Sequence, residues 1–175
     1  LEGLGYTFTE QPHGQSSKTR LIRNIQVFLY RLDFPCLDQI IFLNHDDKKD
    51  LIDAYDLSVP KIHVLGGIGL DLAQYPYSMV SCDKVKFLFI GRLLKEKGIF
   101  EFIDAIRIVK LKHPQAEFTV LGTIDAHNMG ALKQHHLERL LEEQLFEYPG
   151  HVTNVQDWIS GCSVFVLPSY REGVP

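Results

Sequence analysis

The chain has few cysteines and no long apolar run, and these two shortages limit what it can be. Cys36, Cys82 and Cys162 are odd in number, widely spaced and free of any C-x-x-C pair, which disfavours a disulfide framework and a structural zinc site. The longest apolar runs, such as VKFLFI and CSVFVL, fall far short of the roughly 18 residues that would span a bilayer. The sequence therefore predicts a reducing, cytosolic compartment and no transmembrane helix.

An excess of charge of either sign is also missing. Lys and Arg number 18 against 22 Asp and Glu, a formal net charge of -4 over 175 residues. A partner held by overall positive charge, nucleic acid above all, is therefore not expected. With 45% hydrophobic and 23% charged residues, the composition suits one globular domain or parts of two. Because the chain starts at Leu1 rather than Met and stops at Pro175 after a strand-like run, we expect a piece of a longer protein.

The first third of the chain contains one long helical pattern and several short elements. Asn44 is placed to cap a helix, and Asp46 and Asp47 would complement the dipole of its first turn, an explanation we prefer to a metal site. No helical period follows Leu65 until after Cys82, so we interpret this stretch as a linker. The predicted elements are a basic amphipathic helix over 17–32, a strand over 39–43, a helix over 45–55 and a strand over 61–65.

The rest of the chain alternates strands with helices, which calls for a parallel sheet covered by helices on both faces. The predicted strands are 85–90, 117–121, 146–148 and 163–167, and the predicted helices are 98–111, 129–145 and 155–160. The fold class that follows is α/β, with a Rossmann-like parallel sheet and flanking helices.

The first loop of this sheet has the composition of a phosphate site. Ligands bind beyond the carboxyl ends of the strands in an open parallel sheet, so we expect the loops after the first, second and last strands to share one rim. Gly91 allows backbone amides to approach a phosphate, and Arg92 and Lys97 supply positive charge at the start of a helix. The loop predicts a diphosphate anchor; a solvated polar turn is the alternative.

The loop after the last strand, PSYREGVP, places a carboxylate beside a glycine. Glu172 could accept hydrogen bonds from sugar hydroxyls while the amides of Gly173 and Val174 face a ligand. A surface turn with an incidental Glu is the alternative that these residues leave open.

Four strings of the sequence resemble, in order and spacing, the family-4 (group 1) glycosyltransferases, which are retaining enzymes of GT-B fold that use nucleotide-sugars. The strings are FIGRLLKEKGIFEFIDAIRIVK, VLGTIDAHN, YPGHVTNV and VFVLPSYREGVP. The upstream strings LEGLGYTFTE and IIFLNHDDKKDLI are similar to the bacterial branch that builds capsule, O-antigen and related glycans on polyprenyl-diphosphate carriers. The resemblance implies a fragment of a two-domain architecture. Residues 1–65 would end the acceptor-side domain, 66–82 would link the domains, and 83–175 would begin the nucleotide-sugar-binding domain.

The resemblance also implies roles for individual residues. Arg92 and Lys97 match the pair that holds the donor diphosphate and stabilises the leaving nucleotide without a metal. Glu172 matches the first acid of a paired-acid motif, which contacts the donor sugar. The second acid would lie beyond Pro175, so we expect this chain alone to be inactive. Gly91 matches a residue at the diphosphate, and Gly173, Val174 and Pro175 match the segment along the sugar and diphosphate. His151 and Val152 match the region that borders the nucleobase. Glu2 and Gly3 match a loop that faces the reaction centre, although many relatives have His where this chain has Glu2.

The resemblance implies transfer of a hexose or N-acetylhexosamine from a nucleotide-sugar, expected to be UDP-linked, to a glycan or polyprenyl-diphosphate-linked acceptor, with retention of configuration. It implies no cofactor, no metal, no nucleic-acid partner and a cytoplasmic location. The basic helix over 17–32 could meet the inner face of the membrane, or it could be a packed helix with a solvated basic face, the interpretation we favour. Alternatives for the function are a non-catalytic nucleotide-sugar-binding module and another GT-B enzyme such as a phosphorylase.

Overall fold

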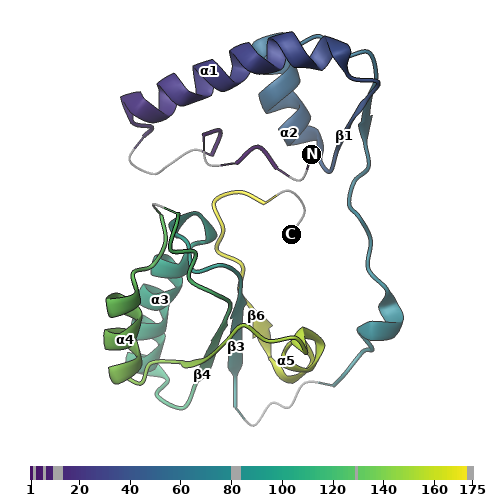
Figure 1. Ribbon diagram of the computed structural model, residues 1–175. Helices are drawn as coiled ribbons and strands as arrows, with labels where there is room; N and C mark the ends of the chain where they lie inside the picture. Colours follow the sequence, from purple (N-terminus) through teal and green to yellow (C-terminus); the bar gives the residue numbers. More distant parts are fainter. Residues whose placement is uncertain (2, 6, 10–13, 80–83, 129, 173–175) are drawn as a thin grey trace. The chain divides into compact units, whose positions relative to one another are not determined.

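A computed structural model describes residues 1, 3–5, 7–9, 14–79, 84–128 and 130–172 (Figure 1). These residues form two compact units: a first unit made of residues 1–70 and the residues from Tyr170 on, and a second unit made of residues 71–169. The sequence-based division differs in two respects. The stretch 66–82, expected to be a linker, is divided between the units after Leu70, and the sequence assigned all of 83–175 to the second domain. The residues from Tyr170 on group with the first unit because Arg171 pairs with carboxylates there.

The first unit is built on two parallel strands with helices around them. Ile40 pairs with Ile62 and Phe42 with Val64. Its core gathers the apolar side chains that face these strands, with Phe42 fully buried. Its elements are α1 (Ser17–Asp33), β1 (Ile40–Phe42), α2 (His45–Lys48), a π-helical continuation of α2 (Lys49–Asp53) and β2 (Ile62–Val64). These elements lie where the sequence predicted them, except that the predicted helix from 45 widens into a π-helix after Lys48.

Helix α1 begins as its sequence predicts but is not buried as we expected. The hydroxyl of Ser16 accepts a hydrogen bond from the backbone nitrogen of Thr19 and so caps the helix. Among its residues only Thr19 and Val27 are buried. Six apolar side chains that we expected in a core are 44–61% exposed: Leu21, Ile22, Ile25, Phe28, Leu29 and Leu32. The expectation was wrong within the described chain, because the first unit covers only the narrow stripe of α1 that contains Val27.

The second unit is a four-stranded parallel sheet with helices on both faces, as the sequence predicted. The strand order is β5-β4-β3-β6, and every pairing is parallel. The strands are β3 (Lys86–Ile90), β4 (Glu117–Leu121), β5 (Glu147–Gly150) and β6 (Val164–Phe165). The helices are α3 (Ile99–Lys112), α4 (Gln134–Glu142) and α5 (Val155–Gly161).

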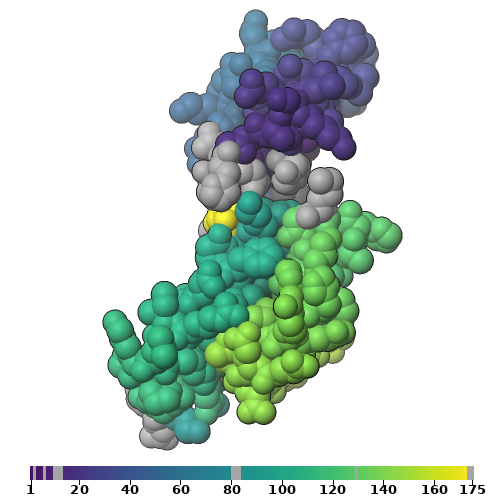
Figure 2. Space-filling view, turned by 90° about the vertical axis from the view of Figure 1, so that its left-hand side faces the viewer, coloured from purple at the N-terminus to yellow at the C-terminus, as the bar shows by residue number. Residues whose placement is uncertain are grey.

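The two faces of this sheet follow from the alternation of side chains along β3. Phe87 and Phe89 point into a core shared with α3 and α4, whereas Leu88 and Ile90 pack with Trp158 of α5. In Figure 1, α3 and α4 accordingly lie on one side of the strands and α5 on the other. Figure 2 shows the outer surface of the helices that cover the first of these faces, where α3 (teal) and α4 (green) lie next to each other.

Helix α4 is shorter than the predicted helix over 129–145. Ala131 forms an antiparallel bridge with Leu94, and the nitrogen of Leu132 donates to the carbonyl of Leu93, so both residues are held by the loop after β3. These contacts delay the start of the helix to Gln134. At the other end, Gln144 adopts a left-handed conformation with φ 54°, which stops the helix. The sequence pattern missed both limits because neither depends on helical periodicity.

Candidate functional site

The loops at the carboxyl ends of the parallel strands form one continuous rim in the second unit. The nitrogen of Gly91, just after β3, donates to the carbonyl of Leu121 at the end of β4 over 2.9 Å. The nitrogen of Gly122 donates in turn to the carbonyl of Gly150 at the end of β5 over 2.8 Å. The hydroxyl of Tyr148 donates to the carbonyl of Gly122 over 2.9 Å, and burial raises the pKa of this phenol. The predicted meeting of the loops after the first two strands of this sheet is therefore confirmed.

Two glycines allow these loops to come together. Gly122 has φ +140°, and a Cβ there would lie 2.8 Å from the carbonyl carbon of Gly91 and overlap its oxygen. Gly98 has φ +73°, and a Cβ there would lie 2.7 Å from the carbonyl carbon of Pro168. The second contact joins the loop after β3 to the loop after β6, as the rim prediction requires. A side chain at either position would have to push backbone atoms apart.

The loop after β3 holds its charged residues on a buried apolar base. Leu93 and Leu94 are fully buried, and the loop then turns through a short 3₁₀ segment (Lys95–Lys97) into Gly98 and helix α3. Arg92 is exposed beside this base, and Lys97 is half-buried at its other end. A cation at each end of an ordered loop, with a helix N-terminus following, is an arrangement able to hold an anionic group.

Arg92 has a partner that the sequence reading missed. Its Nη1 lies 3.2 Å from Oδ2 of Asp125, which follows β4. Both groups are solvent-exposed enough that this ion pair adds little stability. Asp125 does, however, place a negative charge beside the cation that the sequence assigns to a diphosphate. The position of Asp125 in the second of the three rim loops is the signal that could have identified it.

The predicted nucleobase residues lie after β5. Gly150 adopts φ +81° and turns the chain away from the strand, which leaves His151 exposed. Val152 is partly buried and packs against the cluster of Leu88, Leu121 and Cys162. The structure thus places His151 at the solvent side of the rim and gives Val152 a packing contact.

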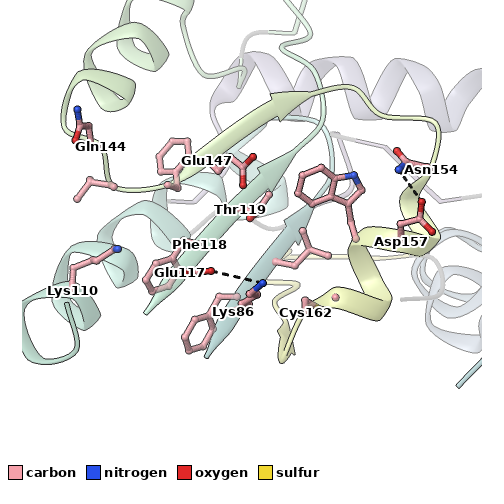
Figure 3. A pocket seen from close by; sticks show the side chains of 16 residues that line it. Lys86, Lys110, Glu117, Phe118, Thr119, Gln144, Glu147, Asn154, Asp157 and Cys162 are labelled. Atoms are coloured by element: carbon pink, nitrogen blue, oxygen red, sulfur yellow. Dashed lines mark hydrogen bonds and ion pairs between the residues drawn. The ribbon is translucent and has the colours of Figure 1, made fainter. Parts of the chain in front are cut away.

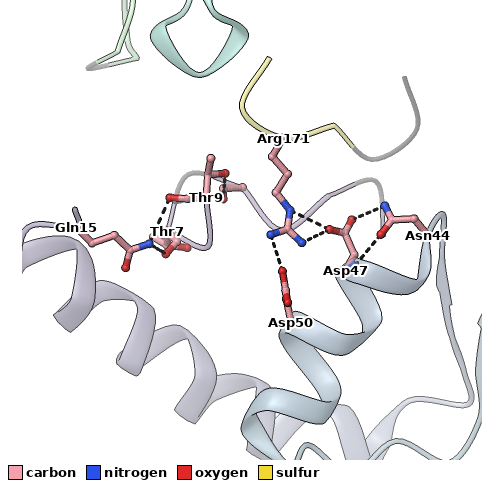
Figure 4. A network of polar contacts seen from close by, with 8 residues as sticks. Thr7, Thr9, Gln15, Asn44, Asp47, Asp50 and Arg171 are labelled. Atoms are coloured by element: carbon pink, nitrogen blue, oxygen red, sulfur yellow. Dashed lines mark hydrogen bonds and ion pairs between the residues drawn. The ribbon is translucent and has the colours of Figure 1, made fainter. Parts of the chain in front are cut away.

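In the first unit, Arg171 binds two carboxylates far away in the sequence (Figure 4). Its Nε and Nη2 donate to Oδ1 of Asp47 over 3.1 and 2.6 Å, and its Nη1 donates to Oδ2 of Asp50 over 2.7 Å. We call this set of contacts the Arg171 clamp. Burial lowers the pKa of the guanidinium, but the hydrogen bonds and charges of Asp47 and Asp50 outweigh burial, so its pKa lies above the usual value.

Asp47 also forms hydrogen bonds with Asn44, the capping residue of its own helix. The side-chain oxygen of Asn44 accepts a hydrogen bond from the backbone nitrogen of Asp47 over 2.6 Å, which confirms Asn44 as the helix cap. The amide nitrogen of Asn44 donates to the second carboxylate oxygen of Asp47 over 3.2 Å. Helix capping therefore explains only part of the role of Asp47, which is 1% exposed. Sequence reasoning missed the Arg171 clamp because nothing local relates residues 47 and 171.

The remaining predicted site residues divide between the units. Glu172 and Gly3 belong to the first unit, whereas Gly91, Arg92, Lys97, His151 and Val152 belong to the second. Gly3 adopts φ +127°. Four predicted residues, Glu2, Gly173, Val174 and Pro175, lie outside the described residues.

A cavity of about 540 Å³ in the second unit lies away from the rim (Figure 3). It is lined at the amino ends of the strands by Lys86 of β3 and Glu117 of β4, which form an ion pair at 3.9 Å, and by Asp157 of α5. Because the rim stands at the opposite ends of these strands, this cavity is not the predicted ligand site.

Comparison with known proteins identifies a family to which this chain is similar. A family model described as "Glycosyl transferases group 1" matches residues 84–175. The N,N'-diacetylbacillosaminyl-diphospho-undecaprenol alpha-1,3-N-acetylgalactosaminyltransferase of Campylobacter jejuni is 28% identical over 188 residues, covering 100% of this chain and 46% of that protein. The UDP-Gal:alpha-D-GlcNAc-diphosphoundecaprenol alpha-1,3-galactosyltransferase of Escherichia coli is 24% identical, covering 92% of this chain and 44% of that protein.

The solved structures agree with the expected fold class. WaaG, a glycosyltransferase involved in lipopolysaccharide biosynthesis, superposes with a TM-score of 0.63 at 16% identity, covering 90% of this chain and 45% of that one. The α/β fold with a parallel sheet, as part of a GT-B architecture, is therefore confirmed. The chain spans less than half the length of these relatives.

Proposed function

Because the chain belongs to the group 1 glycosyltransferases, we propose that it is part of an enzyme that transfers a hexose or N-acetylhexosamine from a nucleotide-sugar, with UDP as the expected nucleotide. The acceptor is a glycan or a polyprenyl-diphosphate-linked sugar, and the anomeric configuration is retained. The names of two relatives support this assignment, since one acts on a diphospho-undecaprenol-linked sugar and the other also uses UDP-Gal. The product would enter a bacterial surface polysaccharide or glycoconjugate.

The observation that carries the proposal is the meeting of the loops that contain Arg92, Lys97 and Pro168. Gly98 lies against Pro168, so the cationic loop after β3 adjoins the loop that leads to Glu172. In the proposed role, the Arg92 and Lys97 side chains and the amino end of α3 bind the diphosphate. Their positive charge stabilises the negative charge that develops on the leaving nucleotide, and no metal or other cofactor is needed.

The proposed reaction breaks the bond between the anomeric carbon and the diphosphate oxygen and forms a bond to the acceptor hydroxyl oxygen on the same face of the sugar. The hydroxyl proton passes to the leaving diphosphate, so no side chain of the protein acts as nucleophile. Glu172 contacts the donor sugar, and His151 and Val152 border the nucleobase. Glu2 and Gly3 are the residues we propose for the acceptor side of the reaction.

We propose a cytoplasmic enzyme that contacts the inner face of the membrane through α1. Among the described residues, no helix has the length and hydrophobicity that crossing a bilayer requires. Helix α1 exposes apolar side chains such as Phe28 and Leu29, and its first turns also expose Lys18 and Arg20. An amphipathic helix with both kinds of side chain favours binding at an anionic surface. Co-sedimentation with vesicles rich in anionic lipid should fall when Arg20 and Arg23 are changed to Glu. Unchanged sedimentation would remove this part of the proposal.

The nucleotide assignment is tested by calorimetric and thermal-shift titration of the chain with UDP, GDP and ADP. UDP should bind preferentially, and Arg92→Ala should weaken binding roughly ten- to hundredfold, because a charge-assisted hydrogen bond contributes about 1.5 to 3 kcal/mol. Arg107→Ala is the matched control, since Arg107 is an exposed arginine of the same unit that pairs with Glu143 away from the rim.

If a folded chain binds no nucleotide, the titration is repeated on a protein extended beyond Pro175, which would contain the second acid of the motif. Binding by the extended protein alone assigns part of the site to the added residues. Absence of binding in both forms contradicts the proposed function. Sugar transfer by the extended protein, rather than binding alone, separates the enzyme from a non-catalytic binding module, and dependence of the reaction on phosphate would indicate a phosphorylase.

A further inference from the structure

Arg171 stands next to the proposed sugar-binding carboxylate, and its side chain is fully engaged elsewhere. Three of its nitrogens donate to Asp47 and Asp50, at 2.6 to 3.1 Å. Asp47 is almost completely buried and holds its orientation through the second hydrogen bond from Asn44. A planar guanidinium bound from two sides in this way keeps a single orientation.

The partners of Arg171 are placed by an unusual feature of α2. Asp47 lies in the α-helical turn and Asp50 in the π-helical segment that follows, three residues later. Figure 4 shows both carboxylates turned toward the same guanidinium. π-Helical turns are rare and occur frequently at functional sites. The two acids thus form a binding site that suits an arginine better than a lysine, because only a guanidinium donates several hydrogen bonds in fixed directions.

The consequence concerns the next residue. Consecutive Cα atoms are about 3.8 Å apart across a planar peptide bond, so fixing Arg171 restricts the backbone of Glu172. Accordingly, we infer that Arg171 is a positioning residue, whose clamp on Asp47 and Asp50 sets the place from which Glu172 contacts the donor sugar. This inference rests on the proposed function, which assigns the sugar contact to Glu172. It adds that Asp47 and Asp50, through Arg171, determine where the backbone of Glu172 is held.

A merely structural role for Arg171 makes a different prediction. Loss of a structural ion pair lowers stability and weakens UDP and UDP-sugar binding alike. A positioning role weakens only the part of the affinity that the sugar contributes. The two roles are therefore separated by the ratio of the dissociation constants for UDP and for a UDP-sugar.

The experiment measures both constants by calorimetry with UDP, UDP-glucose and UDP-N-acetylglucosamine, in whichever form of the protein binds UDP in the titration above. Arg171→Lys keeps the charge but loses the several fixed hydrogen bonds. It should weaken binding of the preferred UDP-sugar about tenfold and change UDP binding less than twofold. Asp47→Asn should have the same effect from the other side of the clamp. Glu172→Gln should match it, and the double variant with Arg171→Lys should be no weaker than either single variant.

The matched control is Arg107→Lys, because Arg107 also binds two carboxylates, those of Asp104 and Glu143, but on the surface of the second unit. It should leave the ratio unchanged. Circular dichroism confirms that each variant is folded. An Arg171→Lys variant that leaves the ratio unchanged, or effects of Arg171→Lys and Glu172→Gln that add fully, would overturn the inference while leaving the proposed function in place. Failure of both forms to bind UDP would contradict the proposed function, and the inference would fall with it.

Discussion

Gly98 lies directly against the carbonyl group of Pro168. A Cβ at residue 98 would come within 2.7 Å of the carbonyl carbon, so the loop after β3 and the loop after β6 meet only because residue 98 has no side chain. The same glycine adopts φ +73° at the start of α3, a conformation that other residues rarely adopt. A glycine at this one position therefore allows the turn, the start of the helix and the contact between the two loops.

Replacing Gly98 by Ala should destabilise the second unit by about 2 to 4 kcal/mol, from overpacking against backbone and from the left-handed conformation. The single tryptophan of the chain, Trp158, lies in this unit, so its fluorescence during urea unfolding reports on it directly. Gly161→Ala is the control, because a Cβ there meets no atom within 4 Å. Equal midpoints for the two variants would show that the contact with Pro168 is easily relieved.

Asp47→Asn should destabilise the first unit by about 2 to 4 kcal/mol. The substitution removes one buried charge of the Arg171 clamp and leaves the guanidinium with Asp50 alone, and breaking a buried pair in this way is costly. Asp46→Asn is the matched control, since Asp46 precedes it in the same turn but is exposed. Circular dichroism follows this unfolding, because Trp158 reports on the other unit. Similar losses for both variants would assign the effect to helix-dipole charge alone.

Asp125→Asn should strengthen UDP binding about threefold. Asp125 pairs with Arg92, so its negative charge both competes for the cation and repels the diphosphate, although exposure keeps the effect below about 1 kcal/mol. The gain should shrink as salt is added, because salt screens exposed charges. Calorimetry alongside Asp104→Asn, an exposed acid on α3, provides the comparison. Weaker binding by Asp125→Asn would mean that Asp125 orients Arg92 rather than competing for it.

The stability of the second unit should fall as the pH drops through about 6.5, in part because of His136. Partial desolvation by neighbouring groups, then the charges of His135 and Arg139, lower the pKa of His136 below its usual value of 6.5. Because the imidazole is exposed, its contribution to stability is small. The unfolded chain therefore binds a proton at a pH where the folded chain does not, and this contribution to stability is complete above pH 6.5 and is lost below it. His136→Gln and Arg139→Gln should each flatten the dependence between pH 7.5 and 5, measured by Trp158 fluorescence. An unchanged slope in both would exclude His136 as its source.

Much of the second unit was predictable because its signals are local. The apolar run at β3, the glycine after it and the helical spacing of α3 are each contained in a few consecutive residues. Parallel strands then bring their carboxyl ends together, so the sequence also predicted that the loops after β3, β4 and β6 would share one rim. The start of α4 was not predictable, because the backbone of Ala131 and Leu132 pairs with the loop at Leu93 and Leu94, which lies far away in the sequence.

The sequence by itself determined the strands, the starts of the described helices other than α4, the rim and the cations on it. Hydrophobic periodicity, capping residues and glycines act on residues that lie close together in the chain. Tertiary structure decided which faces are covered and which charges pair. It left most apolar side chains of α1 exposed, and it joined Arg171 to Asp47 across 124 residues. Such a pair has no sequence signal, because its energy depends on the burial and geometry that only the folded chain creates.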